Sequence, residues 1–164
     1  MKQPPLHIYF GLGSNLGAKE ENIEAAYKKI EERIGTIFSK SAFYVTEPQG
    51  FFSEHLFVNS VCEVVSYMNV NAIFAITKEI EKEIGRAKKS QNGIYSDRII
   101  DIDLLMADNA IINTPELTIP HPKLHLRRFV LEPLAEIAPD LIHPVFNKTV
   151  HELLHELIKE KSLR

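Results

Sequence analysis

The sequence contains a single cysteine, Cys62, and no tryptophan. One cysteine cannot form a disulfide within the chain, and the apolar residues around Cys62 indicate a small buried side chain. No apolar run approaches the length of a membrane-spanning helix. Residues 1–5 are too short and polar for a signal peptide. We therefore expect a cytoplasmic protein that has no membrane partner.

An excess of basic residues is also missing. The chain has 19 Lys and Arg against 22 Asp and Glu, for a formal net charge of −3. Because general nucleic-acid-binding domains are usually strongly basic, we expect no nucleic-acid partner. An anionic ligand would have to be held by a local group of cations. The length of 164 residues suits one domain with one core, so we expect a single domain over residues 1–164, acting as a monomer.

Two common nucleotide-binding motifs are absent. The segment Gly11-Leu-Gly13-Ser14-Asn15-Leu16-Gly17 contains three glycines, but the last is displaced by one position from the dinucleotide-binding fingerprint. No G-x-x-x-x-G-K-[ST] phosphate loop occurs either. An ATP-dependent enzyme with this sequence must use another scaffold, and the glycines are interpreted as a tight turn after the first strand.

Hydrophobic periodicity predicts helices packed on an antiparallel sheet. Asn69 is expected to cap a helix, Pro133 to begin a short one, and Thr149 with Glu152 to form a capping box for the last. Asp108-Asn109 is expected to turn the chain back as a hairpin. The predicted strands cover residues 7–12, 37–46, 57–65 and 99–106. The predicted helical stripes are Ile23, Ala26, Tyr27, Ile30 and Ile34, then Ile73, Ile76, Ile80 and Ile84, then Val150, Leu153, Leu154, Leu157 and Ile158. This order indicates an α+β sandwich with ferredoxin-like topology.

Two acids in the apolar strand 99–106 are the sharpest chemical signal. Asp101 and Asp103 are two residues apart, so both side chains point to the same side of the strand, with their roots roughly 6–7 Å apart. Two adjacent carboxylates repel each other and resist burial, and hard cations such as Mg²⁺ remove both problems. The pair therefore predicts a metal site, with two ions possible. The alternative is an edge strand whose acids face solvent.

A polar segment rich in cations precedes this strand. Arg86 and Arg98 could grip phosphate oxygens through forked donors, and Lys88 and Lys89 lie between them. Gly93 and its polar neighbours would allow the segment to close over a site. Alone, it could equally be a solvated surface loop. Beside the acid pair, it favours a site for a metal-bound polyphosphate.

The histidines and aromatic residues give weaker signals. The backbone of His121 is fixed by prolines on both sides, and Pro122 makes a zinc site formed with His125 improbable. His151 and His155 are expected to face solvent. On pattern alone, three further residues read as ordinary core or strand residues: Phe57, Asn59 and Phe129.

Taken in order, several short motifs resemble those of the 6-hydroxymethyl-7,8-dihydropterin pyrophosphokinase family. The similarity runs from about His7 to Pro144. Each motif is weak alone, but the ordered set is specific. The set is Gly13-Ser14-Asn15-Leu16, Thr46-Glu-Pro48-Gln-Gly50, Phe57-Val-Asn59, Gly85-Arg86, Arg98-x-x-Asp101-x-Asp103-Leu-Leu and Pro120-His121-Pro122.

This resemblance implies a reaction and a set of site residues. The family transfers the β,γ-diphosphoryl group of ATP to the hydroxymethyl oxygen of a reduced pterin, for folate synthesis, and releases AMP. The resemblance assigns two magnesium ions to Asp101 and Asp103, and catalytic roles to the same two acids with Arg86 and Arg98. The implied nucleotide-site residues are Glu81, Lys88, Leu104, Thr118, His121 and Arg127. The implied pterin-site residues are Thr46, Phe57, Asn59 and Phe129.

The sequence departs from the family pattern at a few positions. Ser96-Asp97 stands where many members have Gly-Pro, Tyr95 stands where a tryptophan is common, and Lys88 replaces a second loop arginine. Two other functions stay open at this point: a non-enzymatic ferredoxin-like module for nucleotides or RNA, and a metal-dependent phosphohydrolase. An RNA-binding module would show a basic, aromatic sheet face, and a phosphohydrolase would consume ATP without any pterin.

Overall fold

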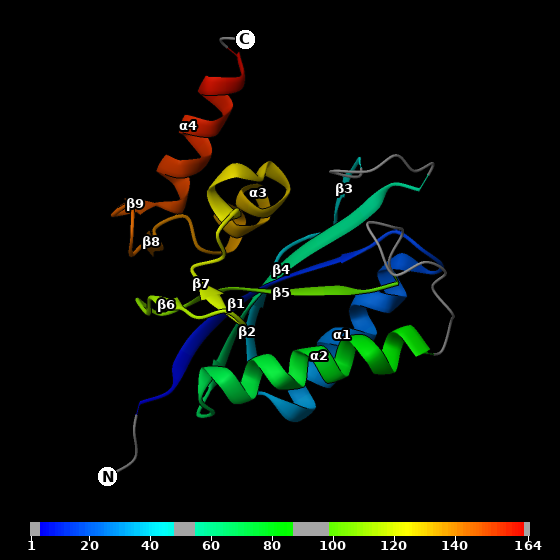
Figure 1. Ribbon diagram of the computed structural model, residues 1–164. Helices are drawn as coiled ribbons and strands as arrows, with labels where there is room; N and C mark the ends of the chain where they lie inside the picture. The colour runs from blue at the N-terminus through cyan, green and yellow to red at the C-terminus, as the bar shows by residue number, and fades with distance from the viewer. Residues whose placement is uncertain (1–3, 48–54, 87–98, 163–164) are drawn as a thin grey trace.

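The computed structural model describes residues 4–47, 55–86 and 99–162. Its centre is a five-stranded antiparallel sheet (Figure 1). The strands lie in the order β2-β4-β1-β5, and β3 pairs with β4 beyond the end of β2. This order is the ferredoxin-like arrangement predicted from the sequence. The strand bounds are β1 Leu6–Ser14, β2 Thr36–Lys40, β3 Tyr44–Thr46, β4 Phe57–Ser66 and β5 Asp101–Ala107.

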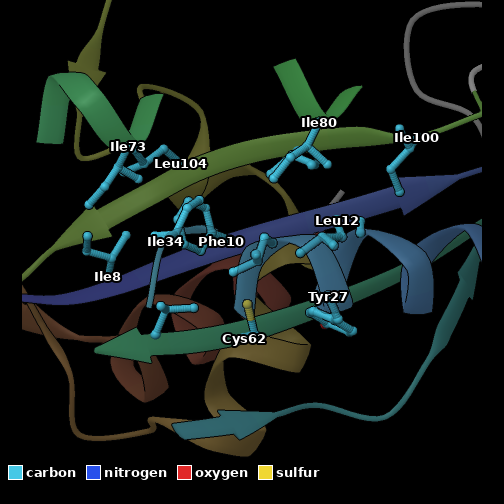
Figure 2. Packing of buried hydrophobic residues seen from close by; sticks show 14 of the residues in the cluster. Ile8, Phe10, Leu12, Tyr27, Ile34, Cys62, Ile73, Ile80, Ile100 and Leu104 are labelled. Atoms are coloured by element: carbon cyan, nitrogen blue, oxygen red, sulfur yellow. The ribbon is translucent and has the colours of Figure 1, made fainter. Parts of the chain in front are cut away.

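Two helices cover one face of the sheet, α1 (Lys19–Arg33) and α2 (Val70–Arg86) (Figure 1). Their apolar stripes meet the alternate residues of the strands in one continuous core. Figure 2 shows two side chains of the sheet, Phe10 and Cys62, within this core. The predicted cap of α2 is confirmed, because the Asn69 side-chain oxygen accepts a 2.8 Å hydrogen bond from the Ala72 amide.

The other face carries the C-terminal part of the chain. Helices α3 (Arg128–Ile137) and α4 (Val150–Ser162) pack over a second core that includes Tyr9, Val61 and Leu105. The predicted capping box is confirmed: the Thr149 amide donates to Glu152, and the Glu152 amide donates to Thr149, both at 3.1 Å. The short elements on this side are β6 Ile112–Asn113, β7 Thr118–Ile119, a 3₁₀ turn Leu124–Leu126, β8 Ile142–His143 and β9 Lys148–Thr149.

Three local predictions were wrong. Gly11 and Gly13 lie inside β1 rather than in a turn, and only Gly17 of this segment has a left-handed backbone, with φ 72°. The predicted strand 37–46 is two strands, β2 and β3, separated at residues 41–43. The turn at Asp108 forms, but β6 after it pairs with β7 rather than with β5.

Two further differences concern the helices. Pro133 lies inside α3 rather than at its start. A proline inside a helix has no amide hydrogen, so the hydrogen bond that residue 133 would donate to the Phe129 carbonyl is missing. Leu131 and Leu134 are buried in the second core and hold α3 in place despite that loss, and Pro133 is itself buried. Ile158 is exposed, because α4 projects beyond the sheet (Figure 1). Within the described ranges, no helix is both long and apolar enough to cross a membrane.

Candidate active site

A pocket of about 120 Å³ opens on the α3 side of the sheet. Four strands contribute to it, and the beginning of α3 forms one wall. Seven of the residues predicted for the site line this pocket, together with residues that the sequence did not single out. The lining residues are Gly11, Leu12, Gly13, Thr46, Glu47, Phe57, Asn59, Ser60, Val61, Asp101, Asp103, Arg127, Phe129 and Val130.

The two acids of β5 both face this pocket, as their spacing predicts. Ile102 between them points into the core on the α1 and α2 side. In the β1–β5 register, Asp101 lies opposite Gly13 and Asp103 lies opposite Gly11. Because these glycines carry no side chain, the space beside the acids stays open to a ligand. β5 is an edge strand, as the alternative expected, but its two acids line a pocket instead of an open surface.

The charge of Asp103 is poorly compensated. Burial, with the neighbouring Asp101 as the second cause, raises the pKa of Asp103 to about 7. A guanidinium nitrogen of Arg127 lies 3.9 Å from its carboxylate and acts in the opposite direction. The Asp103 side chain is 30 % exposed, so a ligand can reach it from the pocket. A cation placed between the two acids would favour their ionised forms.

Arg127 connects the acids to an aromatic wall. Its guanidinium carbon lies 5.5 Å from the centre of the Phe129 ring, and Phe129 belongs to the first turn of α3. Phe57, at the start of β4, lines the same pocket. The pocket therefore presents a positive group and flat apolar surfaces within a short distance of the carboxylates.

Two polar side chains stand beside the aromatic rings. The Asn59 amide nitrogen donates a 2.7 Å hydrogen bond to the Thr46 hydroxyl, across the β3–β4 pair. Asn59 is buried, so its amide is held in a fixed orientation by this contact. A carboxamide offers both a donor and an acceptor to a ligand, which suits the polar edge of a heterocycle.

Other residues predicted for the nucleotide site lie along the outer edge of β5. The Ile102 amide points to this edge and donates a 2.7 Å hydrogen bond to Glu81 of α2. By strand alternation, the backbone groups of Leu104 point the same way, while its side chain is buried in the core. Further along, the His121 amide donates to the Leu105 carbonyl at 2.9 Å, and Thr118 lies in β7 beside β5. None of these residues lines the pocket; they form a rim beyond the acids.

His121 is held in its neutral form. Burial, followed by the charge of Arg127, lowers the pKa of His121 to about 4. Its Nδ1 accepts a 3.1 Å hydrogen bond from the Lys123 amide, so the proton belongs on Nε2. A neutral imidazole with Nε2–H is a hydrogen-bond donor for a ligand oxygen.

Some predicted residues fall outside this description. Lys88 and Arg98 lie outside the described residues, as do Tyr95 and the segment expected to close over the site. Arg86 is the last residue of α2, and the structure describes its backbone. Their assigned roles stay predictions.

The sequence did not predict that Gly13 lines the floor of the pocket, between Asn59 and Phe57. A Cβ atom on Gly13 would lie 3.1 Å from the Asn59 side-chain oxygen and 3.6 Å from the Phe57 ring. Gly13 is thus needed for space rather than for a turn. The spacing of the glycines could have indicated this role, since glycines two residues apart in a strand leave one face without side chains. Their pairing with Asp101 and Asp103 could not be read from the sequence.

Comparison with known proteins gives a consistent result. The sequence model of the family described as 7,8-dihydro-6-hydroxymethylpterin-pyrophosphokinase matches residues 9–139. A 2-amino-4-hydroxy-6-hydroxymethyldihydropteridine pyrophosphokinase of Porphyromonas gingivalis is 44 % identical over 138 residues, which cover 84 % of this chain and 93 % of that protein. The enzyme of the same name from Aquifex aeolicus is 36 % identical over 149 residues, 91 % of each chain.

Similarity to solved structures supports the same fold. The crystal structure of Plasmodium falciparum HPPK-DHPS with pterin and p-hydroxybenzoate aligns with a TM-score of 0.78 and 17 % identity. The alignment covers 99 % of this chain and 45 % of that longer chain.

Proposed function

This chain belongs to the 7,8-dihydro-6-hydroxymethylpterin-pyrophosphokinase family, and we propose that the pocket between β5 and α3 is where it performs that family's reaction. The protein is a pyrophosphokinase of folate biosynthesis. It transfers the β,γ-diphosphoryl group of ATP to the hydroxymethyl oxygen of 6-hydroxymethyl-7,8-dihydropterin and releases AMP. The proposal concerns which residues do this.

Asp101 and Asp103 are proposed to hold magnesium, with two ions expected. The donor set fits, because both acids face one pocket and the raised pKa of Asp103 reports a carboxylate whose negative charge is poorly compensated. No group of three or more metal-binding side chains occurs in residues 4–47, 55–86 and 99–162. A pair of carboxylates suits Mg²⁺, which typically keeps water and substrate phosphates as its other ligands. Magnesium held there would help to neutralise the negative charge of the triphosphate.

The nucleotide is proposed to lie along the outer edge of β5. Leu104 would contribute through its backbone, since its side chain is in the core. His121 would donate from Nε2, and Arg127 would reach a phosphate while remaining close to Asp103. Glu81 and Thr118 lie on the same rim. Arg86, Lys88 and Arg98 are proposed to complete the phosphate site from the segment before β5.

The pterin is proposed to lie between Phe57 and Phe129. Both rings line the pocket, and a flat heterocycle binds favourably against aromatic faces. Asn59 and Thr46 would read its polar edge. Gly11 and Gly13 would leave room for the ring system beside the acids.

The chemistry then depends chiefly on position and charge. The pterin hydroxyl oxygen forms a bond to the β-phosphorus, and the bond from that phosphorus to the oxygen bridging to the α-phosphate breaks. The hydroxyl proton leaves to solvent or to a phosphate oxygen. Phosphoryl-type transfer needs little more from the protein than alignment of the two substrates and stabilisation of the developing charge. Arg127 would contribute to both, since it lies between the acids and the aromatic wall.

The observation that carries this proposal is the meeting of two substrate surfaces in one pocket. The acid pair occupies one end, and an aromatic and amide slot occupies the other. A phosphohydrolase would need the first surface but not the second. An RNA-binding module would need a basic sheet face, whereas this face carries Asp101 and Asp103. The proposal also includes a monomeric, cytoplasmic enzyme of one domain, residues 1–164, whose partners are small-molecule substrates.

Magnesium affinity should depend on pH in a defined direction. Asp103 must lose its proton to bind the ion, and its pKa in the metal-free protein is about 7. We therefore expect affinity for Mg²⁺ to fall by up to about tenfold for each pH unit below 7 and to level off above 8. Calorimetric titration of the substrate-free protein with Mg²⁺ at pH 5.5, 6.5, 7.5 and 8.5 measures this. The Asp103→Asn variant should bind weakly with little pH dependence. An equally steep pH dependence in that variant would place the metal elsewhere.

A further inference from the structure

Glu136 lies near the end of α3 and makes contacts that the proposed reaction does not use. Its carboxylate accepts a 2.6 Å hydrogen bond from the Tyr44 hydroxyl. It also accepts the Ala42 amide, at 3.0 Å to one oxygen and 3.3 Å to the other. Tyr44 and Ala42 belong to β3 and to the connection before it. Glu136 therefore ties α3 directly to β3.

The two elements that Glu136 joins each contribute to the lining of the pocket, β3 through Thr46 and α3 through Phe129. Phe129 is seven residues before Glu136 on α3, two helical turns away on the same side of the helix. Thr46 is two residues after Tyr44, on the same face of β3. In the β3–β4 register, Tyr44 lies opposite Asn59, and Thr46 lies opposite Phe57. The contacts of Glu136 are thus linked by rigid backbone to the residues proposed to bind the pterin.

Apart from its contact with α3, β3 is held by its ladder with β4 and by the Asn59–Thr46 hydrogen bond. It is three residues long, and its ladder partner is β4. Strands this short are weakly held by their own hydrogen bonds. Hydrogen bonds to a charged carboxylate are stronger than those between neutral groups, so Glu136 strengthens the attachment of β3 to α3.

We propose that Glu136 is a positioning residue for the pterin substrate. By binding the Tyr44 hydroxyl and the Ala42 amide, it sets the separation between the α3 wall with Phe129 and the β3 wall with Thr46. That separation fixes where Thr46, at the polar edge of the proposed pterin site, lies relative to Phe129, on which the ring would stack. This inference rests on the proposed location of the pterin, and it assigns Glu136 no contact with either substrate.

The hydrogen bond between Tyr44 and Glu136 is expected to persist across the neutral pH range. The hydrogen bond to Glu136 raises the pKa of Tyr44 to about 12, with partial burial as a second cause. The Tyr44 hydroxyl therefore stays a donor throughout the neutral pH range. Glu136 is exposed, so its replacement leaves no buried charge without a partner, and the variant should fold.

The same helix offers a matched control. Glu132 lies one turn before Glu136, and its carboxylate accepts from Arg128 of the same helix. Glu132 is thus a helix glutamate with an ion pair that joins no second element. Replacing it changes charge and helix composition as replacing Glu136 does, without releasing β3.

The test compares affinities for the two substrates. We measure binding of the pterin alcohol by calorimetry, with Mg²⁺ and saturating α,β-methylene ATP, and binding of the ATP analogue alone. Glu136→Ala should weaken pterin binding by about 5–30-fold and change ATP-analogue binding by less than about twofold. Glu136→Gln should recover most of the loss, since its side-chain oxygen still accepts hydrogen bonds. Glu132→Ala should behave as the unmodified protein.

A double variant tests the route of the effect. If Glu136 acts through the Tyr44 hydroxyl, Tyr44→Phe with Glu136→Ala should weaken pterin binding no more than Glu136→Ala alone. Full additivity would contradict that route. Unchanged pterin affinity in Glu136→Ala, or an equal loss for both ligands, would overturn the proposal, even if the melting temperature falls.

A reference variant separates this inference from the site assignment. Phe129→Ala is measured in the same way. If it weakens pterin binding and Glu136→Ala does not, the slot is correctly located and the positioning role is wrong. If Phe129→Ala leaves pterin binding unchanged, the slot assignment fails, and the role of Glu136 fails with it.

Discussion

Replacing Asp103 with asparagine is expected to remove most of the activity and, without magnesium at pH 8, to make the protein more stable. Activity should fall at least ~10²–10³-fold, the usual loss when one electrostatic stabiliser of a transition state is removed. The gain in stability follows from the charge of Asp103, which the metal-free pocket compensates poorly. A residue that is required for turnover yet destabilises the fold is typical of a functional site.

The sign of the stability effect depends on pH. The pKa of Asp103 is raised in the folded protein to about 7, from 3.8. Between these values the unfolded chain is ionised while the folded one holds the proton, so stability falls as pH rises from about 4 to 7. Asparagine does not ionise and escapes this loss. We expect Asp103→Asn to raise the free energy of unfolding by about 1–3 kcal/mol at pH 8 and by much less at pH 4.5.

Denaturant unfolding at both pH values, with and without Mg²⁺, measures this effect. Added Mg²⁺ should stabilise the unmodified protein and have little effect on the variant. Asp101→Asn should also lose activity, because both carboxylates are proposed to hold the ion. Near-normal turnover in both variants would contradict the metal assignment. A less stable Asp103→Asn protein at pH 8 would mean that Asp103 is structural.

Replacing Phe129 with alanine is expected to weaken pterin binding far more than nucleotide binding. Stacking of an aromatic side chain on a base is worth roughly 1–3 kcal/mol, or about 5–150-fold in affinity. Phe129 lines the pocket, while the nucleotide is proposed to lie along the outer edge of β5. The loss for an ATP analogue should therefore stay within about threefold, since Arg127 loses its contact with the ring.

Calorimetry with the two ligands in turn gives both affinities. Phe38 provides a matched control, because it is 70 % exposed on β2 and does not line the pocket. Phe38→Ala should leave both affinities unchanged. Equal weakening of pterin and nucleotide by Phe129→Ala would instead mark Phe129 as part of the structural core.

Features that depend on one element could be predicted from the sequence. The spacing of Asp101 and Asp103 determines that they share a face in any strand. The pairing of Thr149 with Glu152 is a local geometry of one helix start, and it forms as expected. Likewise, the helical stripes of α1 and α2 place their apolar residues in the core.

Features that depend on two elements could not be predicted in the same way. Gly13 reads as a turn residue in isolation, and its role as pocket floor appears once β1, β4 and β5 are in register. Leu104 matches a nucleotide-site position, yet the alternation that sends Asp103 into the pocket sends the Leu104 side chain into the core. The tie between Glu136 and Tyr44 joins residues 92 positions apart, and neither residue carries a local signal of it.

The products of one incubation test the central claim most directly. The protein is incubated with ATP, Mg²⁺ and 6-hydroxymethyl-7,8-dihydropterin, and the products are resolved by phosphorus NMR, with parallel samples lacking the pterin. In the proposed site the triphosphate lies beside the acids and the alcohol lies in the aromatic slot, so AMP and a pterin diphosphate should accumulate together, and only when the pterin is present. Formation of ADP and a pterin monophosphate, or consumption of ATP without the pterin, would contradict this account.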